Sequence, residues 1–249
     1  MTETIVTGAS GFIGSHLMKR LPNAKPLCHH EIGLGGLNTA DKLFFLSTYG
    51  NMAHHSVRGM MVQANVVDLI HVIKIGFKGW LCYMSSSSVT LPVQTPYSRT
   101  KRAAEEILQA LPELKSCIVR PYSVTGVGEQ KEHLIPTLIR SCMEGEEIPF
   151  DPNPVHDFVD VEDVVKVLIE LSDSQATGII EIGRSVTHTN DEVRKLVERE
   201  TGRKANIKER IGLRSYDNAK WRCKEPSFYR MKTLNQSITE MVEAYKREH

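Results

Sequence analysis

The chain has 249 residues, with 31 basic and 30 acidic side chains and a formal net charge of +1. This balance argues against nucleic-acid binding, which needs a basic surface for the phosphates. No apolar run is long enough to cross a bilayer, and the first residues do not resemble a signal peptide. The five cysteines are odd in number and scattered, which predicts a reduced, cytoplasmic protein. The length suits one large α/β domain, alone or with a small appendage.

A glycine-rich turn follows the first predicted strand, a β-branched run over residues 4–7. Gly8, Gly11 and Gly14 lie in this turn, and a helix is predicted from about 13 to 21. Gly8 permits a sharp turn, Gly11 lets a pyrophosphate approach the backbone, and Gly14 lets the helix pack close to the strand. The N-terminus of such a helix favours anions. The turn therefore predicts a dinucleotide site, with an ordinary glycine-rich turn as the alternative.

The second predicted strand covers residues 26–28 and ends at His29, His30 and Glu31. In dinucleotide-binding folds an acidic side chain at this place binds the ribose of the adenosine. Here the acid is missing or is displaced to Glu31, and a histidine would suit a 2′-phosphate. NAD and NADP both remain open, and the alternative is that the two histidines are surface residues at a strand end.

Two more predicted strands end in hydroxyl side chains. An apolar run over 42–47 precedes Thr48, and a second run over 80–84 precedes four serines, 85–88. The carboxyl ends of parallel strands form the ligand-binding edge of a doubly wound sheet. Because residues 31–41 are too few for a further helix and strand, the sheet is expected to be a trimmed version of this fold.

Tyr97 and Lys101 lie four residues apart in a predicted helix that opens at Pro96, so they share one helical face. An ammonium group near a phenol favours the phenolate and lowers its pKa. A phenol tuned in this way can act as a general acid or base. The same spacing recurs at Tyr216 and Lys220 without a preceding serine-ended strand, and we attribute that copy to chance.

Together these motifs resemble the extended short-chain dehydrogenase/reductases, and in particular their NAD-dependent nucleotide-sugar epimerase/dehydratase branch. The resemblance rests on the Thr-Gly-x-x-Gly-x-x-Gly pattern at 7–14, the serine-ended strand and Tyr-x-x-x-Lys at 97–101. Later stretches agree, at 117–126, 134–149, 156–164 and 178–183. The resemblance implies an α/β fold, with a trimmed Rossmann-like doubly wound parallel sheet and a small C-terminal substrate lobe. The expected dinucleotide-binding domain is 1–122 plus 155–182, and the expected substrate lobe is 123–154 plus 183–249.

The resemblance also implies roles for individual residues. Tyr97 would be the acid/base, Lys101 would hold the nicotinamide ribose, and one serine would bind the same oxygen as Tyr97. Ser87 matches that serine best and Ser86 is the next candidate. The implied cofactor contacts are Gly8, Ser10, Gly11, Phe12, Ile13, Gly14, His29, Leu46, Lys101 and Tyr122. The implied substrate contacts are Thr48, Ser86, Ser87, Ser123, His156 and Arg210.

The chain departs from the family pattern at several of these positions. The two residues after Ser87 include no carboxylate, which disfavours water elimination and leaves epimerisation or reduction. Ser123 replaces a frequent asparagine and His156 replaces a usual arginine, although a neutral histidine binds a diphosphate less well than a guanidinium. Arg210 or Arg214 is expected to supply the missing charge.

The leading prediction is therefore an NAD(P)-dependent epimerase of a nucleotide sugar, with NAD as cofactor and NADP as the alternative. A second prediction is an NAD(P)H-dependent reductase of a keto-sugar or another carbonyl compound, and a third is a non-catalytic dinucleotide-binding protein. The resemblance implies a homodimer formed through the helices at 65–75 and 97–108. No metal is expected, because no carboxylate or cysteine joins the paired histidines at ligand spacing.

Overall fold

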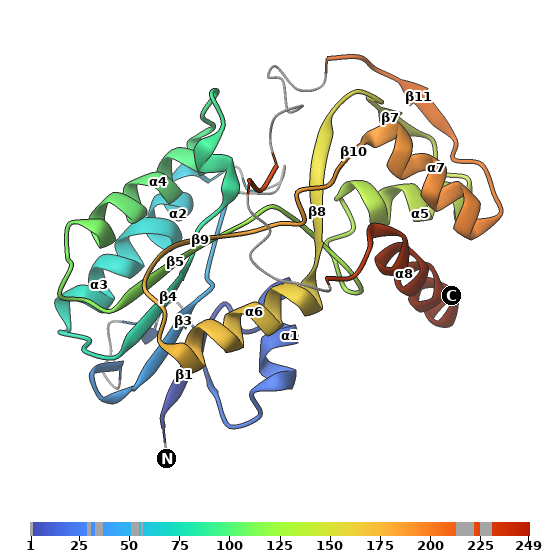
Figure 1. Ribbon diagram of the computed structural model, residues 1–249. Coiled ribbons are helices and arrows are strands. Elements are labelled where there is room, and N and C mark those ends of the chain that lie inside the picture. Colours follow the sequence, from blue (N-terminus) through green and yellow to red (C-terminus); the bar gives the residue numbers. More distant parts are fainter. Residues whose placement is uncertain are drawn as a thin grey trace. The chain divides into compact units, whose positions relative to one another are not determined.

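The computed structural model describes residues 2–28, 31–32, 37–50, 55, 57–212, 222–224 and 231–249 (Figure 1). The chain divides into two compact units, residues 1–121 with 165–181 and residues 122–164 with 182–249. Tyr122, residues 155–164 and Ile182 are expected from the sequence in the dinucleotide-binding domain, whereas here they belong to the second unit. Among the described residues, no helix is both long and apolar enough to cross a membrane.

The first unit is built on a six-stranded sheet. Across the sheet the strands are β2 (Lys25–Leu27), β1 (Thr4–Thr7), β3 (Lys42–Phe45), β4 (Trp80–Met84), β5 (Ser116–Pro121) and β9 (Gly178–Ile182). The strands from β2 to β5 pair in parallel. Thr7, Phe45 and Tyr83 are in register, so the residues that follow them lie along one edge of the sheet. The predicted Rossmann-like fold class is confirmed.

Helices cover this sheet, and α2, α3 and α4 lie together on one face (Figure 1). The α-helices are α1 (Phe12–Arg20), α2 (Arg58–Val62), α3 (Asp68–Lys74), α4 (Pro96–Gln109) and α6 (Val161–Ser174). Shorter turns are the π-helix η3 (Gln63–Val67) and the 3₁₀-helices η2 (Leu37–Thr39) and η4 (Ser87–Thr90). Leu69, Leu108 and Tyr83 belong to one buried cluster, so α3 and α4 pack on the face to which Tyr83 points. Burial of this cluster positions α4, which carries the predicted acid/base.

The described residues of the second unit form two small sheets and three helices. The strands are β6 (Ser123–Thr125), β8 (Val155–Asp160) and β10 (Thr187–Thr189) in one sheet and β7 (Ile148–Phe150) and β11 (Ile207–Glu209) in the other. The helices are α5 (Leu134–Glu144), α7 (Asn190–Thr201) and α8 (Leu234–Glu248). Capping boxes begin α7 at Thr189 and α8 at Thr233, which satisfies otherwise unpaired backbone N–H groups. A buried apolar cluster joins the three helices.

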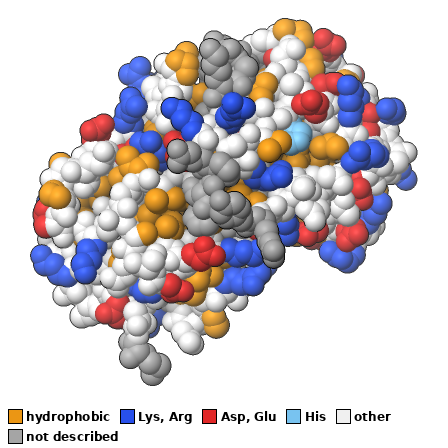
Figure 2. Space-filling model, in the orientation of Figure 1, with side chains coloured by type: hydrophobic (Ala, Val, Ile, Leu, Met, Phe, Trp, Pro, Cys, Tyr) orange, Lys and Arg blue, Asp and Glu red, His pale blue; other side chains and the backbone are white. Residues whose placement is uncertain are grey.

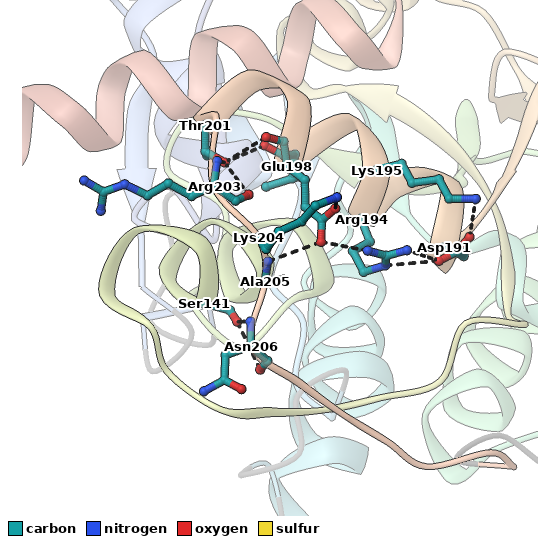
Figure 3. A network of polar contacts seen from close by, with 11 residues as sticks. Ser141, Asp191, Arg194, Lys195, Glu198, Thr201, Arg203, Lys204, Ala205 and Asn206 are labelled. Carbon is teal, nitrogen blue, oxygen red and sulfur yellow. Dashed lines mark hydrogen bonds and ion pairs between the residues drawn. The ribbon is translucent and has the colours of Figure 1, made fainter.

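A network of charged side chains ties α7 to the chain that follows it (Figure 3). The Arg194 guanidinium lies 2.6 Å from Asp191 and 2.7 Å from Glu198. Glu198 also accepts hydrogen bonds from Lys204, at 2.7 Å, and from the Ala205 backbone, at 3.2 Å. Elsewhere on the surface, the face in Figure 2 shows basic and acidic side chains interspersed. The Glu198 carboxylate therefore fixes the loop after α7 by accepting hydrogen bonds from Lys204 and Ala205.

Replacing Glu198 with glutamine is expected to destabilise the fold by about 1 to 3 kcal/mol, because the donors around it lose a charged acceptor. Burial raises the pKa of Glu198, but the bonds from Lys204, Arg194 and Ala205 outweigh it and hold the pKa below its usual value. A lowered pKa stabilises the fold above the unfolded-state value, near pH 4.3, and this stabilisation is lost as pH falls through the folded-state value. Denaturant unfolding between pH 3 and 7 tests this, with the exposed Glu209→Gln as control. An equal loss in the two variants would contradict the assignment.

Candidate functional site

The glycine turn between β1 and α1 has a geometry that only glycine can satisfy. Gly8 has a φ of +66°, and a Cβ there would lie 2.8 Å from the Leu46 carbonyl carbon. A Cβ on Gly14 would lie 2.0 Å from the Gly8 carbonyl oxygen, and one on Gly11 would lie 3.2 Å from it. The Gly11 N–H also donates to this oxygen, at 3.0 Å. The close packing of β1, β3 and α1 therefore depends on Gly8 and Gly14.

The N-terminus of α1 is suited to an anion. Gly11 occupies the capping position without a side-chain hydrogen bond, and the first turn contains no acidic residue. Ser10 next to it is exposed, while Phe12 and Ile13 are half-buried. Free backbone N–H groups and the helix dipole favour a phosphate here. The cradle that the glycines leave open thus fits the pyrophosphate of a dinucleotide.

Glu31, the displaced acid predicted after the second strand, lies just after the end of β2. The Cys28 N–H donates to the Glu31 carboxylate at 2.8 Å, and the Glu31 N–H donates to the Cys28 carbonyl at 3.0 Å. The carboxylate is thus engaged in a local turn. His29, the predicted contact for the adenosine end, lies outside the described residues, and so does Arg214.

The end of β3 connects the glycine turn to the predicted acid/base. The Thr7 hydroxyl accepts hydrogen bonds from the Leu46 N–H, at 3.1 Å, and from the Ser47 N–H, at 3.2 Å. Thr48, the next residue, is hydrogen-bonded to the hydroxyl of Tyr97. Leu46, Ser47 and Thr48 therefore connect the glycine turn with Tyr97 along one edge of the sheet.

Tyr97 lies in the first turn of α4, which Thr95 caps by accepting a hydrogen bond from Ser98. Its hydroxyl lies within hydrogen-bonding reach of the side chains of Thr48 and Ser86. Burial raises the pKa of Tyr97, and hydrogen bonding to these two side chains lowers it in part. The spacing to Lys101 predicts that this residue lowers the Tyr97 pKa, but in the structure the lowering contributions come from the two hydroxyls. The structure thus presents Tyr97 as a neutral phenol in contact with two other hydroxyl groups.

Lys101 is fully buried one turn after Tyr97. Its Nζ donates to the Met84 carbonyl at 2.8 Å and lies 4.9 Å from the centre of the Tyr83 ring. Burial lowers the pKa of Lys101 to about 7, and the charge of Glu105 acts in the opposite direction. Burial therefore disfavours the ammonium form of Lys101, and the charge of Glu105 favours it.

The serines after β4 have different surroundings. Ser86 lies within hydrogen-bonding reach of the Tyr97 hydroxyl, and its Oγ donates to Ser88 Oγ at 2.9 Å. Ser87 is fully buried, and its Oγ donates to the Pro121 carbonyl at 2.8 Å. The first turn of η4 thus directs the two side chains to different partners. This geometry favours Ser86 over Ser87, the better match by sequence, as the serine that shares an oxygen with Tyr97.

Ser86→Ala is expected to lower turnover by about tenfold or more, because a hydroxyl beside the reacting oxygen is removed. Ser87→Ala is expected to act mainly on stability, at a cost of about 1 to 2 kcal/mol, because it leaves the Pro121 carbonyl without its donor. Steady-state kinetics and thermal unfolding of both variants separate the two roles. A larger loss of turnover in Ser87→Ala would reverse the assignment.

Asn65 is a site residue that the sequence analysis did not single out. It is fully buried in η3, and its Oδ1 accepts from Thr48 Oγ1, at 3.2 Å, and from the Tyr49 N–H, at 3.0 Å. Its Nδ2 donates to the Tyr49 carbonyl, at 2.8 Å, and to Thr100 Oγ1, at 2.9 Å. One amide thus fixes the loop that carries Thr48 to the helix that carries Tyr97. The available signal was only that a polar residue lies beside the apolar run of the predicted helix, since buried polar groups are hydrogen-bonded.

The second unit contains the remaining predicted contacts. Ser123 Oγ lies 3.1 Å from Nδ1 of His156, whose ring is nearly buried beside Phe158. Tyr122, the predicted cofactor contact, donates its hydroxyl to the Arg222 carbonyl at 2.9 Å. Arg210 is exposed after β11, and its N–H donates to the Phe150 carbonyl at 2.8 Å. The structure therefore pairs Ser123 with His156.

Asp157 is a second residue that the sequence analysis left without a role. Its buried carboxylate accepts backbone N–H groups of Arg184 and Ser185, at 2.9 Å each, and of Cys223, at 3.0 Å. Burial raises the pKa of Asp157, and these bonds lower it in part. Ser185 has a φ of +58°, a conformation that the carboxylate helps to hold. Asp157 thus fixes the backbone around residues 183–185 and 222–224, next to His156 in the chain.

A metal centre is not formed by the described residues, which contain no group of three or more His, Cys, Asp or Glu side chains placed to hold an ion.

Comparison with known families agrees with these features. A profile described as the NAD dependent epimerase/dehydratase family matches residues 82–183, from β4 to the end of β9. The resemblance that the sequence predicts is thereby confirmed for these residues, which carry the pattern of the NAD-dependent epimerase/dehydratase family. A search of curated proteins finds no match.

Solved structures with this fold include several proteins of low sequence identity. MoeE5 in complex with UDP-glucuronic acid and NAD is 22% identical, with a TM-score of 0.84 and all of both chains covered. The UDP-glucose 4-epimerase of Thermotoga maritima with UDP-glucose is 19% identical, with a TM-score of 0.80 and 99% of each chain covered. RMD of Pseudomonas aeruginosa complexed with NADPH is 18% identical, with a TM-score of 0.81 and all of both chains covered. These matches support the fold over the whole length of the chain.

Proposed function

We propose that this protein is an NAD(P)-dependent epimerase of a nucleotide sugar, with Tyr97 as its acid/base. One observation carries the proposal: the Tyr97 hydroxyl lies within hydrogen-bonding reach of the Thr48 and Ser86 side chains. These two residues follow β3 and β4 at the sheet edge where the glycine turn follows β1. Thr7 links that turn to the residues just before Thr48. A dinucleotide in the turn and a hydroxyl substrate at Tyr97 would then share one edge of the sheet.

The residues of the first unit have separate roles in this proposal. Tyr97 accepts the proton of a sugar hydroxyl and returns it, while Ser86 binds the same oxygen and orients it. Lys101 holds a ribose hydroxyl of the cofactor through its ammonium group. When bound, the cofactor supplies a nicotinamide ring that accepts a hydride and returns it, and its positive charge favours the Tyr97 phenolate. Epimerisation requires the hydride to return to the opposite face of the sugar carbon.

Several observations support a nucleotide sugar and disfavour water elimination. MoeE5 and the Thermotoga maritima epimerase were solved with UDP-sugars. The residues after Ser86 are Ser87 and Ser88, so a carboxylate pair for elimination is absent at this place. In the second unit, we propose Ser123, His156 and Arg210 as contacts of the nucleotide diphosphate.

NAD is the cofactor that we propose, because MoeE5 was solved with NAD. NADP is the alternative, since RMD was solved with NADPH. We further propose a homodimer formed through the helices at 65–75 and 97–108.

Incubation with a panel of UDP- and dTDP-hexoses, followed by NMR, tests the proposed function. Formation of an epimer without added reductant is the expected result. Oxidation of added NADPH by a keto-sugar, with no epimer from any hexose, would replace the epimerase by a reductase. Dinucleotide binding without either reaction would contradict the proposed enzyme.

A further inference from the structure

Glu105 is a buried carboxylate that the proposed reaction does not use. It lies on α4, one turn after Lys101 and two turns after Tyr97, so the three residues share one helical face. Only 1% of Glu105 is exposed. A carboxylate taken out of water is costly unless it is paired and hydrogen-bonded. Its partners therefore identify what it holds in place.

The partners of Glu105 come from the two strands next to α4. Arg120 on β5 donates from Nε at 2.9 Å and from Nη2 to the second carboxylate oxygen. Ser85, directly before Ser86 at the end of β4, donates its hydroxyl to the same carboxylate. The carboxylate thus joins the helix of Tyr97 to the strand end that carries Ser86.

The ammonium form of buried Lys101 is stabilised by a charge of opposite sign nearby. Its Nζ has a backbone carbonyl and the Tyr83 ring as contacts, and both are uncharged. Among the described residues, the Tyr83 ring from β4 contacts Lys101, and the charge of Glu105 from α4 acts on it. Arg120 from β5 is paired with Glu105, and Glu181 from β9 lies next to Arg120. Glu181 lies 4.0 Å from Arg120, on the far side of it from Glu105. Within the part of the chain that the structure describes, Glu105 is thus the anionic group that acts on Lys101.

We propose that Glu105 is a positioning residue that keeps Lys101 in its ammonium form and holds Ser85, and with it Ser86, against α4. This inference rests on the proposed function, because Lys101 and Ser86 belong to that site. Arg120 limits the effect, since it neutralises part of the charge that Glu105 presents to Lys101. The carboxylate opposes the burial that would otherwise deprotonate the amine.

NMR titration of the lysine Cε resonances measures this directly, in the full chain and without turnover. The Lys101 resonance is assigned by its loss in Lys101→Arg. The wild-type pKa of Lys101 is expected near about 7, where burial lowers it and the charge of Glu105 raises it. Glu105→Gln is expected to lower it by about one pH unit or more, because an opposite charge one turn away is removed. The neighbouring exposed Glu106→Gln is the matched control and is expected to leave it unchanged.

A second variant shifts the same resonance in the opposite direction. Arg120→Gln removes a positive charge beside Glu105, so the pKa of Lys101 is expected to rise. Loss of packing alone would not produce shifts of opposite sign in two variants of one ion pair. An unchanged Lys101 titration in both variants, or equal shifts of one sign, would overturn the proposal.

Turnover gives a second readout. If the ammonium form of Lys101 is the active one, a decrease of one pH unit in its pKa lowers turnover about tenfold at pH 8 and less than about twofold at pH 5. A loss of equal size at both pH values would show a structural role only. Absence of turnover in the wild type would contradict the proposed function instead, and the Lys101 titration would still decide the role of Glu105.

Discussion

Tyr97→Phe is expected to lower turnover by about 10²- to 10⁴-fold, because it removes the proton-transferring hydroxyl from the sheet edge. Dinucleotide binding should persist, since the turn at 8–14 and Lys101 are unchanged. The bonds to Thr48 and Ser86 are lost, but both partners keep other bonds, so the fold should be retained. Steady-state kinetics and calorimetric titration with NAD and NADP measure the two properties.

Tyr245→Phe provides the control for that variant. Tyr245 lies on α8 in the second unit, where its hydroxyl donates to Glu144. Turnover should remain within about twofold of the wild type, as expected for a surface substitution. Wild-type turnover in Tyr97→Phe would remove Tyr97 from the mechanism, whatever the control shows.

Gly14→Ala is expected to abolish dinucleotide binding and to destabilise the fold by about 3 kcal/mol or more. A Cβ at this position would lie 2.0 Å from the Gly8 carbonyl oxygen and 2.9 Å from the Ala9 Cα. Both are backbone atoms, so α1 must move away from β1 and the cradle at its N-terminus is lost. Denaturant unfolding gives the stability, and calorimetric titration gives the affinity.

Gly59→Ala is the matched control for Gly14→Ala. Gly59 lies in α2, and a Cβ there would meet no atom within 4 Å. Alanine favours the helix over glycine, so a gain of up to about 1 kcal/mol is expected with no change in affinity. Wild-type affinity and stability in Gly14→Ala would show that α1 does not pack closely enough on the turn at Gly8 to exclude a Cβ at position 14.

The parts of the fold that follow from local sequence could be predicted well. The spacing of Gly8, Gly11 and Gly14 after a β-branched run defines a strand, a turn and a helix, because each glycine meets a backbone constraint. Apolar runs at 42–47 and 80–84 correspond to β3 and β4, since buried parallel strands need continuous apolar side chains. The helix after Pro96 begins where the fixed φ of proline is tolerated.

The details of the candidate site depended on contacts that sequence patterns do not contain. The direction of Ser86 and Ser87 is set by a 3₁₀ turn and by the Pro121 carbonyl, 34 residues away from Ser87. Asn65 lies in a π turn, where the helical period of 3.6 no longer indicates which side chains share a face. The pKa of Tyr97 is governed by burial, which the spacing to Lys101 could not reveal.

The proposed function depends on a dinucleotide bound at the glycine turn, and mass spectrometry tests this most directly. The purified protein is incubated with equimolar NAD and NADP, separated from unbound ligand and denatured, and the released molecules are identified. We expect about one dinucleotide per chain from the wild type, predominantly NAD, and none from Gly14→Ala. Release of no dinucleotide from the wild type, or of equal amounts from both proteins, would contradict the proposed site.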